Sequence, residues 1–252
     1  MDIGVGNKQG KSRVYGENAS VVEFGCIKEI YAFRAKNSSN ALNAVMLQED
    51  SSELPHFRNE FEADVLDRTI DFESKNILDV GCGAGRVAGI IPSNIESYTG
   101  IDFSEELLDI ANKKFANEGK YKFICDDLKI KHSSLSSLDS KFDVIFIAGL
   151  FMYYNDEEIS ITLGNIKSLL NDKCTIYLRE SISIMGERLT LNEFYSEKLQ
   201  SSYSSIYRTE QEYLELLKPL TNNSFKLVET EFFPDELATN KETNLKYFVF
   251  KR

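Results

Sequence analysis

A glycine-rich turn near residue 80 has the residue types and spacing of a ligand-binding loop. Residues 75–86 read Lys-Asn-Ile-Leu-Asp-Val-Gly-Cys-Gly-Ala-Gly-Arg, so an apolar strand carrying Asp79 runs into Gly81, Gly83 and Gly85. Glycine tolerates positive φ and lets the backbone pass close to a ligand. Residues 86–91 predict the start of a helix, whose free N–H groups would face the same space. The pattern therefore predicts a βα turn that binds a nucleotide or a nucleoside.

Further strand-like segments follow this turn and end in residues suited to the same ligand. They are Asp102 at the end of residues 96–102, Asp126 and Asp127 within residues 121–128, and Ala148 within residues 142–149. An acid at the distance of Asp102, 17 residues after the last glycine of the turn, can accept hydrogen bonds from two ribose hydroxyls. Carboxyl ends of parallel strands meet at one edge of a sheet, so these residues are expected to surround one ligand.

The spacing of the glycines in the turn distinguishes two classes of nucleotide-binding fold. The dinucleotide pattern G-x-G-x-x-G would need glycine at position 86, where this chain has Arg86. The pattern D-x-G-x-G-x-G instead resembles motif I of the class I S-adenosylmethionine-dependent methyltransferases. The order of acid–glycine turn, acid, acid and aromatic loop matches that family across residues 75–180. A carboxylate at the strand end also suits the ammonium and sulfonium of S-adenosylmethionine and would repel a pyrophosphate.

This resemblance implies a cofactor, S-adenosyl-L-methionine, with S-adenosyl-L-homocysteine as its product. It also implies a set of cofactor-binding residues: Asp79, Gly81, Cys82, Gly83 and Gly85 around the methionine, Asp102 and Phe103 at the ribose and adenine, Asp126 or Asp127 with Leu128 at the adenine edge, Ala148 at the methionine end, and Arg58 at the carboxylate. Of the two adjacent acids, only one can point inward from a strand end.

Alternating strands and helices predict an α/β fold with a doubly wound parallel sheet. The expected strands cover residues 75–80, 98–102, 121–125, 142–148, 173–179, 225–231 and 245–251. Only the last two lack a helix between them, so they should form an antiparallel hairpin. The resemblance implies a seven-stranded Rossmann-like methyltransferase sheet with helices on both faces and a reversed last strand.

The expected domain covers residues 54–252, beginning with a helix over 54–66, and follows an N-terminal extension or lid at 1–53. Residues 180–212 are predicted to be a substrate-covering insertion, a loop that feeds into a helix capped by Thr209 and Glu212.

Composition limits the partners. The 252 residues carry a net charge of −11, which disfavours nucleic acid. No run approaches the ~20 apolar residues of a membrane span, and the N-terminus does not resemble a signal peptide. The four cysteines show no C-x-x-C pairing, which predicts buried reduced thiols in a cytoplasmic protein and no structural zinc. A small-molecule acceptor is the expected partner, and the oligomeric state stays open.

Candidates for the acceptor side have side chains that move protons or bind anions. They are His56, Tyr153, Glu180, Tyr207 and Arg208. His56 is interpreted as a general base on a hydroxyl, which Tyr153 would orient. Arg208 would clamp a phosphate or carboxylate, and Glu180 would end its strand at the cleft. Metal dependence is not expected, because Ala148 and Gly149 stand where metal-dependent catechol-type O-methyltransferases place an acid.

The predicted function is methyl transfer from S-adenosylmethionine to a small polar metabolite, anionic or sugar-derived. O-methylation is favoured, because one histidine is within reach and the Asn/Asp-Pro-Pro-Tyr motif of amide methylation is absent. An N-methyltransferase acting on a small amine or a protein N-terminus is the alternative within the class. Two other classes stay open: an NAD-binding dehydrogenase or epimerase, which Arg86 and the C-terminal hairpin oppose, and an inactive S-adenosylmethionine-binding partner subunit, which the intact acids oppose.

Overall fold

The computed structural model describes residues 12–16, 21–38, 40–47, 52–115, 117–130, 138, 140–197, 201–221 and 224–252. The parts of the expected extension and insertion at residues 1–11, 17–20, 39, 48–51 and 198–200 lie outside the described residues.

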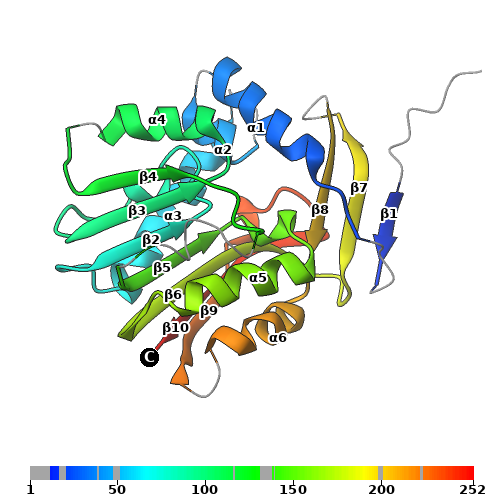
Figure 1. Cartoon of the computed structure of the whole chain (residues 1–252). Helices are drawn as coiled ribbons and strands as arrows, with labels where there is room; N and C mark the ends of the chain where they lie inside the picture. The colour runs from blue at the N-terminus through cyan, green and yellow to red at the C-terminus, as the bar shows by residue number, and fades with distance from the viewer. Residues whose placement is uncertain are drawn as a thin grey trace, which may run out of the picture.

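A seven-stranded sheet forms the centre of the molecule, in the order β4-β3-β2-β5-β6-β10-β9 (Figure 1). Its strands are β2 (Asn76–Val80), β3 (Ser97–Asp102), β4 (Tyr121–Cys125), β5 (Phe142–Ala148), β6 (Leu170–Ser183), β9 (Lys226–Phe232) and β10 (Thr243–Lys251). Strands β2 to β6 pair in parallel, whereas β10 is antiparallel to both β6 and β9. The predicted sheet and its reversed last strand are confirmed.

Helices cover both faces of this sheet (Figure 1). They are α1 (Gly25–Asn37), α2 (Ala41–Val45), α3 (Leu54–Thr69), α4 (Glu105–Phe115), α5 (Asp156–Lys167) and α6 (Glu210–Thr221). The predicted cap of α6 forms, because Thr209 and Glu212 bond reciprocally, and at the start of α4 the Ser104 hydroxyl accepts the N–H of Leu107. Such caps satisfy donors that have no partner inside the helix.

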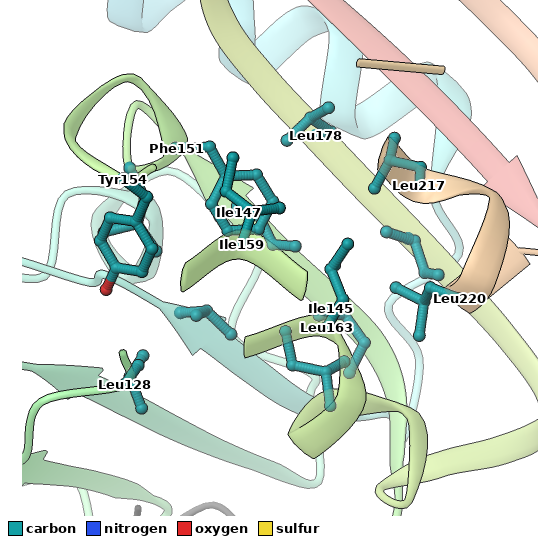
Figure 2. Packing of buried hydrophobic residues seen from close by; sticks show 14 of the residues in the cluster. Leu128, Ile145, Ile147, Phe151, Tyr154, Ile159, Leu163, Leu178, Leu217 and Leu220 are labelled. Carbon is teal, nitrogen blue, oxygen red and sulfur yellow. The ribbon is translucent and has the colours of Figure 1, made fainter. Parts of the chain in front are cut away.

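The alternation along β5 explains why the core divides into two layers. Ile145 and Ile147 pack toward α5 and α6, whereas Val144 and Phe146 belong to the cluster that includes α3. Figure 2 shows the first layer, where these isoleucines lie among leucines and isoleucines of α5 and α6. Successive side chains of a strand point to opposite faces, so a strand buried on both faces reads as a continuous apolar run.

Two local predictions were wrong. The segment after the glycine turn forms only a short 3₁₀ turn, η1 (Val87–Gly89), rather than an α-helix. Most of the expected loop at 180–212 is strand: β7 (Leu189–Ser196) and β8 (Ser201–Tyr207) form a hairpin, and β1 (Ser12–Tyr15) adds to it as a third antiparallel strand. Serine-rich β8 lacks the apolar alternation that marks a strand in sequence.

The N-terminal helices lie over the edge of the sheet where the parallel strands end. Helix α1 contacts α4 and β8, and α2 contacts α1 and α3. Of the cysteines, Cys82 and Cys174 are free and buried as expected, but Cys125 is exposed at the end of β4, the edge strand of the described sheet. The side chain of Cys26 lies outside the described part. Among the described helices, none is both long and apolar enough to cross a membrane.

Candidate active site

A cavity of about 350 Å³ lies at the carboxyl ends of β2, β3, β5 and β6, where parallel α/β sheets bind their ligands. One part of its wall is here called the glycine side: Gly81, Cys82, Gly83, Asp102 and Phe103. A second part is called the tyrosine side: Tyr31, Met152, Tyr153, Tyr203 and Tyr207. A third part is called the arginine cluster: Arg58, Glu62, Arg86 and Arg179.

The glycine turn brings its backbone up to the cavity as expected. Gly81 has φ of 80°, and a Cβ there would lie 2.9 Å from Cδ1 of Leu150, so only glycine fits without displacement. Gly85 also has a positive φ, 72°, but it faces Phe115 of α4 and does not line the cavity. The predicted cofactor contact therefore moves to residues 81–83, and Gly85 serves the packing of the turn on α4.

Asp102 is the best-defined acid of the glycine side. Its side chain is buried, Oδ1 accepts the N–H of Ser104 and Oδ2 accepts the N–H of Gly83, both at 2.9 Å. Burial raises the pKa of Asp102, and the backbone donors of Ser104, Gly83 and Phe103 oppose that rise. A carboxylate oxygen can accept more than one hydrogen bond, so this fixed group on the cavity wall retains capacity for hydroxyl donors. These residues fit the ribose of S-adenosylmethionine.

Asp79 lies below the cavity rather than in its wall. It is buried within β2 and accepts a hydrogen bond from the hydroxyl of Tyr98 on the neighbouring strand β3. Burial raises the pKa of Asp79 to about 7, although the Tyr98 hydrogen bond opposes the shift. Asp79 is absent from the cavity lining, and its Oδ2 accepts the Tyr98 hydroxyl, so its direct contact with the cofactor stays a prediction.

The predicted adenine edge lies next to the cavity but outside its lining. The N–H of Asp126 donates to the carbonyl of Asp102 at 2.9 Å, which ties the end of β4 to the end of β3. Asp127 is exposed and accepts the N–H of Lys129, while Leu128 is buried in the core. The structure separates the two acids, and the adenine role of Asp126 stays a prediction.

The arginine cluster is a buried ion network. Glu62 has no exposed surface and accepts Arg86 Nη1 at 2.7 Å and Arg179 Nε at 3.3 Å. Burial alone would raise the pKa of Glu62, but the charges of Arg179 and Arg86 outweigh it and hold this pKa below its ordinary value. Arg58 donates to the carbonyl of Leu237 through Nε at 2.9 Å and Nη2 at 2.5 Å. This part of the wall thus holds three cations and one carboxylate, which pairs with Arg86 and Arg179.

The position of Arg58 on the cavity wall agrees with the sequence prediction. Burial and the nearby Arg179 lower the pKa of Arg58 to about 10, which leaves the guanidinium charged near neutral pH. Across the described ion pairs, none joins Arg58 to a carboxylate. Its charge is therefore available to an anion bound in the cavity.

Four tyrosines from three separate elements form the tyrosine side. The hydroxyls of Tyr31 and Tyr153 lie 3.4 Å apart with their rings edge-on, and those of Tyr203 and Tyr207 lie 3.5 Å apart. Burial raises the pKa of Tyr31 to about 12 and that of Tyr153 well above its ordinary value. Tyr31 and Tyr153 therefore stay neutral at physiological pH and offer hydrogen bonds rather than a base.

Three predicted acceptor-side residues lie outside the cavity lining. His56 is exposed at the start of α3, with its Nε2 3.1 Å from the Nδ2 of Asn40. Arg208 has no exposed surface, and its guanidinium binds backbone carbonyls and Asp156. Glu180 is fully buried behind the segment that follows β5. The structure thus places His56 and Arg208 away from the lining, and their roles as base and anion clamp stay predictions, whereas Tyr153 and Tyr207 do line the cavity.

The alternation of β6 explains the misplacement of Glu180. Leu178 and Ile182, two residues before and after it, belong to the core layer beside α5 and α6. Arg179, one residue earlier, points to the other face and reaches the cavity. A period of two along the strand would have selected Arg179. Tyr31 and Tyr203 were missed because the sequence gives no sign that α1 and β8 fold over this edge.

Comparison with known proteins supports the same fold and cofactor. A family model described as "Methyltransferase domain" matches residues 77–173. Phosphoethanolamine N-methyltransferase 1 of Zea mays is 29% identical over 140 residues, which are 56% of this chain and 27% of that protein. A ubiquinone biosynthesis O-methyltransferase of Coxiella burnetii is 28% identical over 104 residues, 41% of this chain and 43% of that protein. The chain thus spans about a quarter of the length of the plant relatives it matches.

Solved structures with low sequence identity share the fold. Phosphoethanolamine N-methyltransferase 1 of Haemonchus contortus, in complex with phosphoethanolamine and S-adenosylhomocysteine, has a TM-score of 0.69 at 20% identity, covering 89% of this chain and 47% of that one. The magnesium protoporphyrin IX methyltransferase of Synechocystis PCC 6803 with bound S-adenosylmethionine has a TM-score of 0.59 at 15% identity, covering 94% and 100%. The glycine turn, Asp102 and the family match agree: residues 77–173 match a methyltransferase domain, and the chain has the fold of S-adenosylmethionine-dependent methyltransferases.

Proposed function

We propose that this protein transfers a methyl group to the amine nitrogen of a small acceptor that also carries a phosphate or carboxylate. The arginine cluster carries this proposal. Three buried or half-buried arginines face the cavity, and two of them already share Glu62. The carboxylate of S-adenosylmethionine can neutralise one charge, and the remaining positive charge favours an anionic group on the acceptor.

The choice of an amine rests on what faces the cavity. A hydroxyl acceptor needs a base, whereas an amine needs only to be neutral when it attacks. His56, the base expected from the sequence, lies outside the lining, and burial raises the pKa of Tyr31 and Tyr153 so that both stay neutral. The preference for O-methylation therefore loses its main support. Relatives named as phosphoethanolamine N-methyltransferases favour the same acceptor chemistry.

The chain's own residues have separable tasks in this reaction. Bound S-adenosylmethionine supplies an electrophilic methyl on a sulfonium, which is already a good leaving group. Asp102 holds the ribose hydroxyls, and the arginine cluster holds the two anionic groups. The tyrosine side orients the nitrogen by hydrogen bonds and excludes water from it. The nitrogen lone pair forms the new N–C bond as the S–C bond breaks, and the product ammonium loses a proton to solvent.

O-methylation is the second candidate, and one observation favours it: the Coxiella burnetii relative is named an O-methyltransferase. In that case the base would have to come from the acceptor, from water or from residues outside the described part. Metal independence also stays a prediction. Within the described ranges, no group of three His, Cys, Asp or Glu side chains has the arrangement of a metal site.

Methyl transfer read by mass spectrometry tests the proposal. The protein is incubated with S-adenosylmethionine labelled in its methyl group and with phosphoethanolamine as the first probe, then with a panel of amino acids and amino sugar phosphates. Ethanolamine and ethylene glycol monophosphate serve as matched controls that lack the anion and the amine. We expect label only on compounds with both groups. Label on the glycol phosphate at an equal rate would contradict the choice of an amine.

A further inference from the structure

A short turn carries two residues of the tyrosine side into the cavity. This is the 3₁₀ turn η3 (Phe151–Tyr153), which follows β5 and presents Met152 and Tyr153. A single 3₁₀ turn has little stability of its own, because few hydrogen bonds oppose the conformational entropy of its residues. Its geometry must therefore be imposed by groups outside it.

Glu180 binds the beginning of this turn. Its Oε1 accepts the N–H of Leu150 at 2.9 Å and the N–H of Phe151 at 2.8 Å. The side chain has no exposed surface, and its Oε2 has no hydrogen-bond partner among the described residues. A buried carboxylate with an unused oxygen is costly, so its retention points to a demand for the bonds that Oε1 makes.

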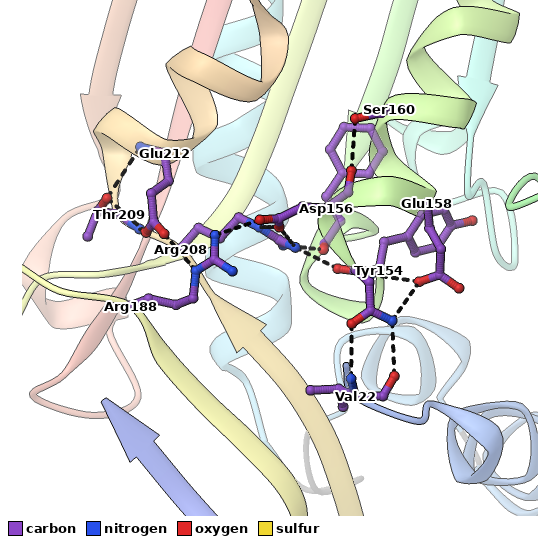
Figure 3. A network of polar contacts seen from close by, with 11 residues as sticks. Val22, Tyr154, Asp156, Glu158, Ser160, Arg188, Arg208, Thr209 and Glu212 are labelled. Atoms are coloured by element: carbon purple, nitrogen blue, oxygen red, sulfur yellow. Dashed lines mark hydrogen bonds and ion pairs between the residues drawn. The ribbon is translucent and has the colours of Figure 1, made fainter. Parts of the chain in front are cut away.

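Arg208 binds carbonyls on the first residue of the same turn and on the residue that follows it (Figure 3). Its Nη1 donates to the carbonyl of Phe151 at 2.8 Å, and its Nη2 donates to the carbonyl of Tyr154 at 2.7 Å. Its Nε donates to Oδ1 of Asp156 at 2.8 Å, and Asp156 also binds Arg188 at 2.9 Å. Because β8 ends at Tyr207, one short segment both supplies a cavity tyrosine and fixes the turn that supplies another.

We infer that Glu180 and Arg208 are positioning residues that hold η3 from its two ends and so keep the Tyr153 hydroxyl beside Tyr31 on the cavity wall. Glu180 accepts the N–H groups at the start of the turn, and Arg208 donates to the carbonyls of Phe151 and Tyr154, which flank the turn at its first residue and just past its last. Neither touches the cavity. The catalytic meaning of this device rests on the proposed function, since that assigns Tyr153 to the acceptor, but the positioning itself can be tested without any methyl transfer.

The test places one 3-fluorotyrosine at position 153 in the full chain and records its ¹⁹F resonance with saturating S-adenosylhomocysteine. Glu180→Ala removes the acceptor, and Glu180→Gln keeps an oxygen of the same reach. Asp143→Ala is the matched control: this carboxylate also accepts a backbone N–H, that of Asn76 at 2.9 Å, but at the opposite end of β5. We expect a shifted or broadened resonance in Glu180→Ala and near-native resonances in Glu180→Gln and Asp143→Ala.

A second measurement needs no variant. In the wild-type chain, the amides of Leu150 and Phe151 should exchange with solvent deuterium at least about tenfold more slowly than unbonded loop amides, because a buried carboxylate accepts both. Fast exchange at both amides would overturn the inference even if Glu180→Ala failed to fold. An unmoved resonance in Glu180→Ala, or an equal change in Asp143→Ala, would overturn it as well. A failed methyl-transfer assay would leave these readouts unchanged, so the two proposals can fail separately.

Discussion

The glycine side and the tyrosine side of the cavity are assembled from different stretches of chain. The glycine side comes from two adjacent parallel strands and the turns that follow them, within residues 81–103, and one carboxylate, Asp102, joins the two turns. The tyrosine side combines α1, η3 and β8, which are more than 170 residues apart at their extremes. Local geometry fixes the first, whereas the second exists only when distant segments meet. The two sides should therefore respond differently to substitution.

Glu62 belongs to the arginine cluster rather than to either side, and its removal should have the largest effect. Glu62→Ala leaves Arg86 and Arg179 buried without their shared carboxylate. Breaking such a buried network costs about 3–5 kcal/mol of unfolding free energy. Denaturant titration measures this loss. Glu60→Ala, an exposed acid on the same helix, is the control and should change stability little. A loss below about 1 kcal/mol in Glu62→Ala would mean that the network contributes little to the fold.

The pH dependence of stability tests two buried carboxyl groups, one near each side of the cavity. Asp79 lies below the glycine side and Glu180 behind the tyrosine side, and burial raises the pKa of each to about 7. The folded state then holds these protons more tightly than the unfolded chain does. Their contribution is complete below about pH 4 and is lost as the pH rises through 7.

The free energy of unfolding should therefore fall between pH 5 and pH 8, by at most about 3 kcal/mol for each group. Glu180→Gln should remove one part of this slope and Asp79→Asn the other. Denaturant titrations at a series of pH values provide the measurement. A slope unchanged in both variants would show that neither carboxyl titrates in this range.

Asp102 tests the glycine side alone. Asp102→Ala should weaken S-adenosylhomocysteine binding by at least about 1.5 kcal/mol, roughly tenfold, because charge-assisted hydrogen bonds to a ribose are lost. Asp109→Ala, an exposed acid on α4, should bind as the wild type does. Isothermal titration calorimetry gives both affinities, and NAD should show no binding. Wild-type affinity in Asp102→Ala would contradict the placement of the ribose.

Removing one hydroxyl from the tyrosine side should have the smallest effect and should leave cofactor binding unchanged. Tyr203→Phe removes one partner of the Tyr203–Tyr207 pair without changing the ring. We expect S-adenosylhomocysteine affinity within about twofold of the wild type and an acceptor KM raised about threefold, since one neutral hydrogen bond is lost. Tyr121→Phe, away from the cavity lining, is the control. Weaker binding of S-adenosylhomocysteine in Tyr203→Phe would mean that the tyrosine side also contributes to cofactor binding.

The same contrast decides how much could be predicted from the sequence. The strands, the glycine turn and Asp102 depend on short-range patterns, and they were found. Arg179 was missed by one position, because strand alternation was not applied to the end of β6. Tyr31 and Tyr203 depend on long-range packing of α1 and β8, which no local pattern reveals. Arg208 has the chemistry of an anion clamp, and only its burial against Asp156 and two carbonyls shows its structural task.

The central claim is that the cavity accepts a small molecule with both an amine and an anion once the cofactor product is bound. Calorimetric titration of phosphoethanolamine into the protein saturated with S-adenosylhomocysteine tests it most directly, with ethanolamine as the matched ligand that lacks the phosphate. The account predicts a measurable heat of binding for phosphoethanolamine and none for ethanolamine at the same concentrations. Equal binding of the two ligands would contradict the assignment of the arginine cluster to the acceptor anion.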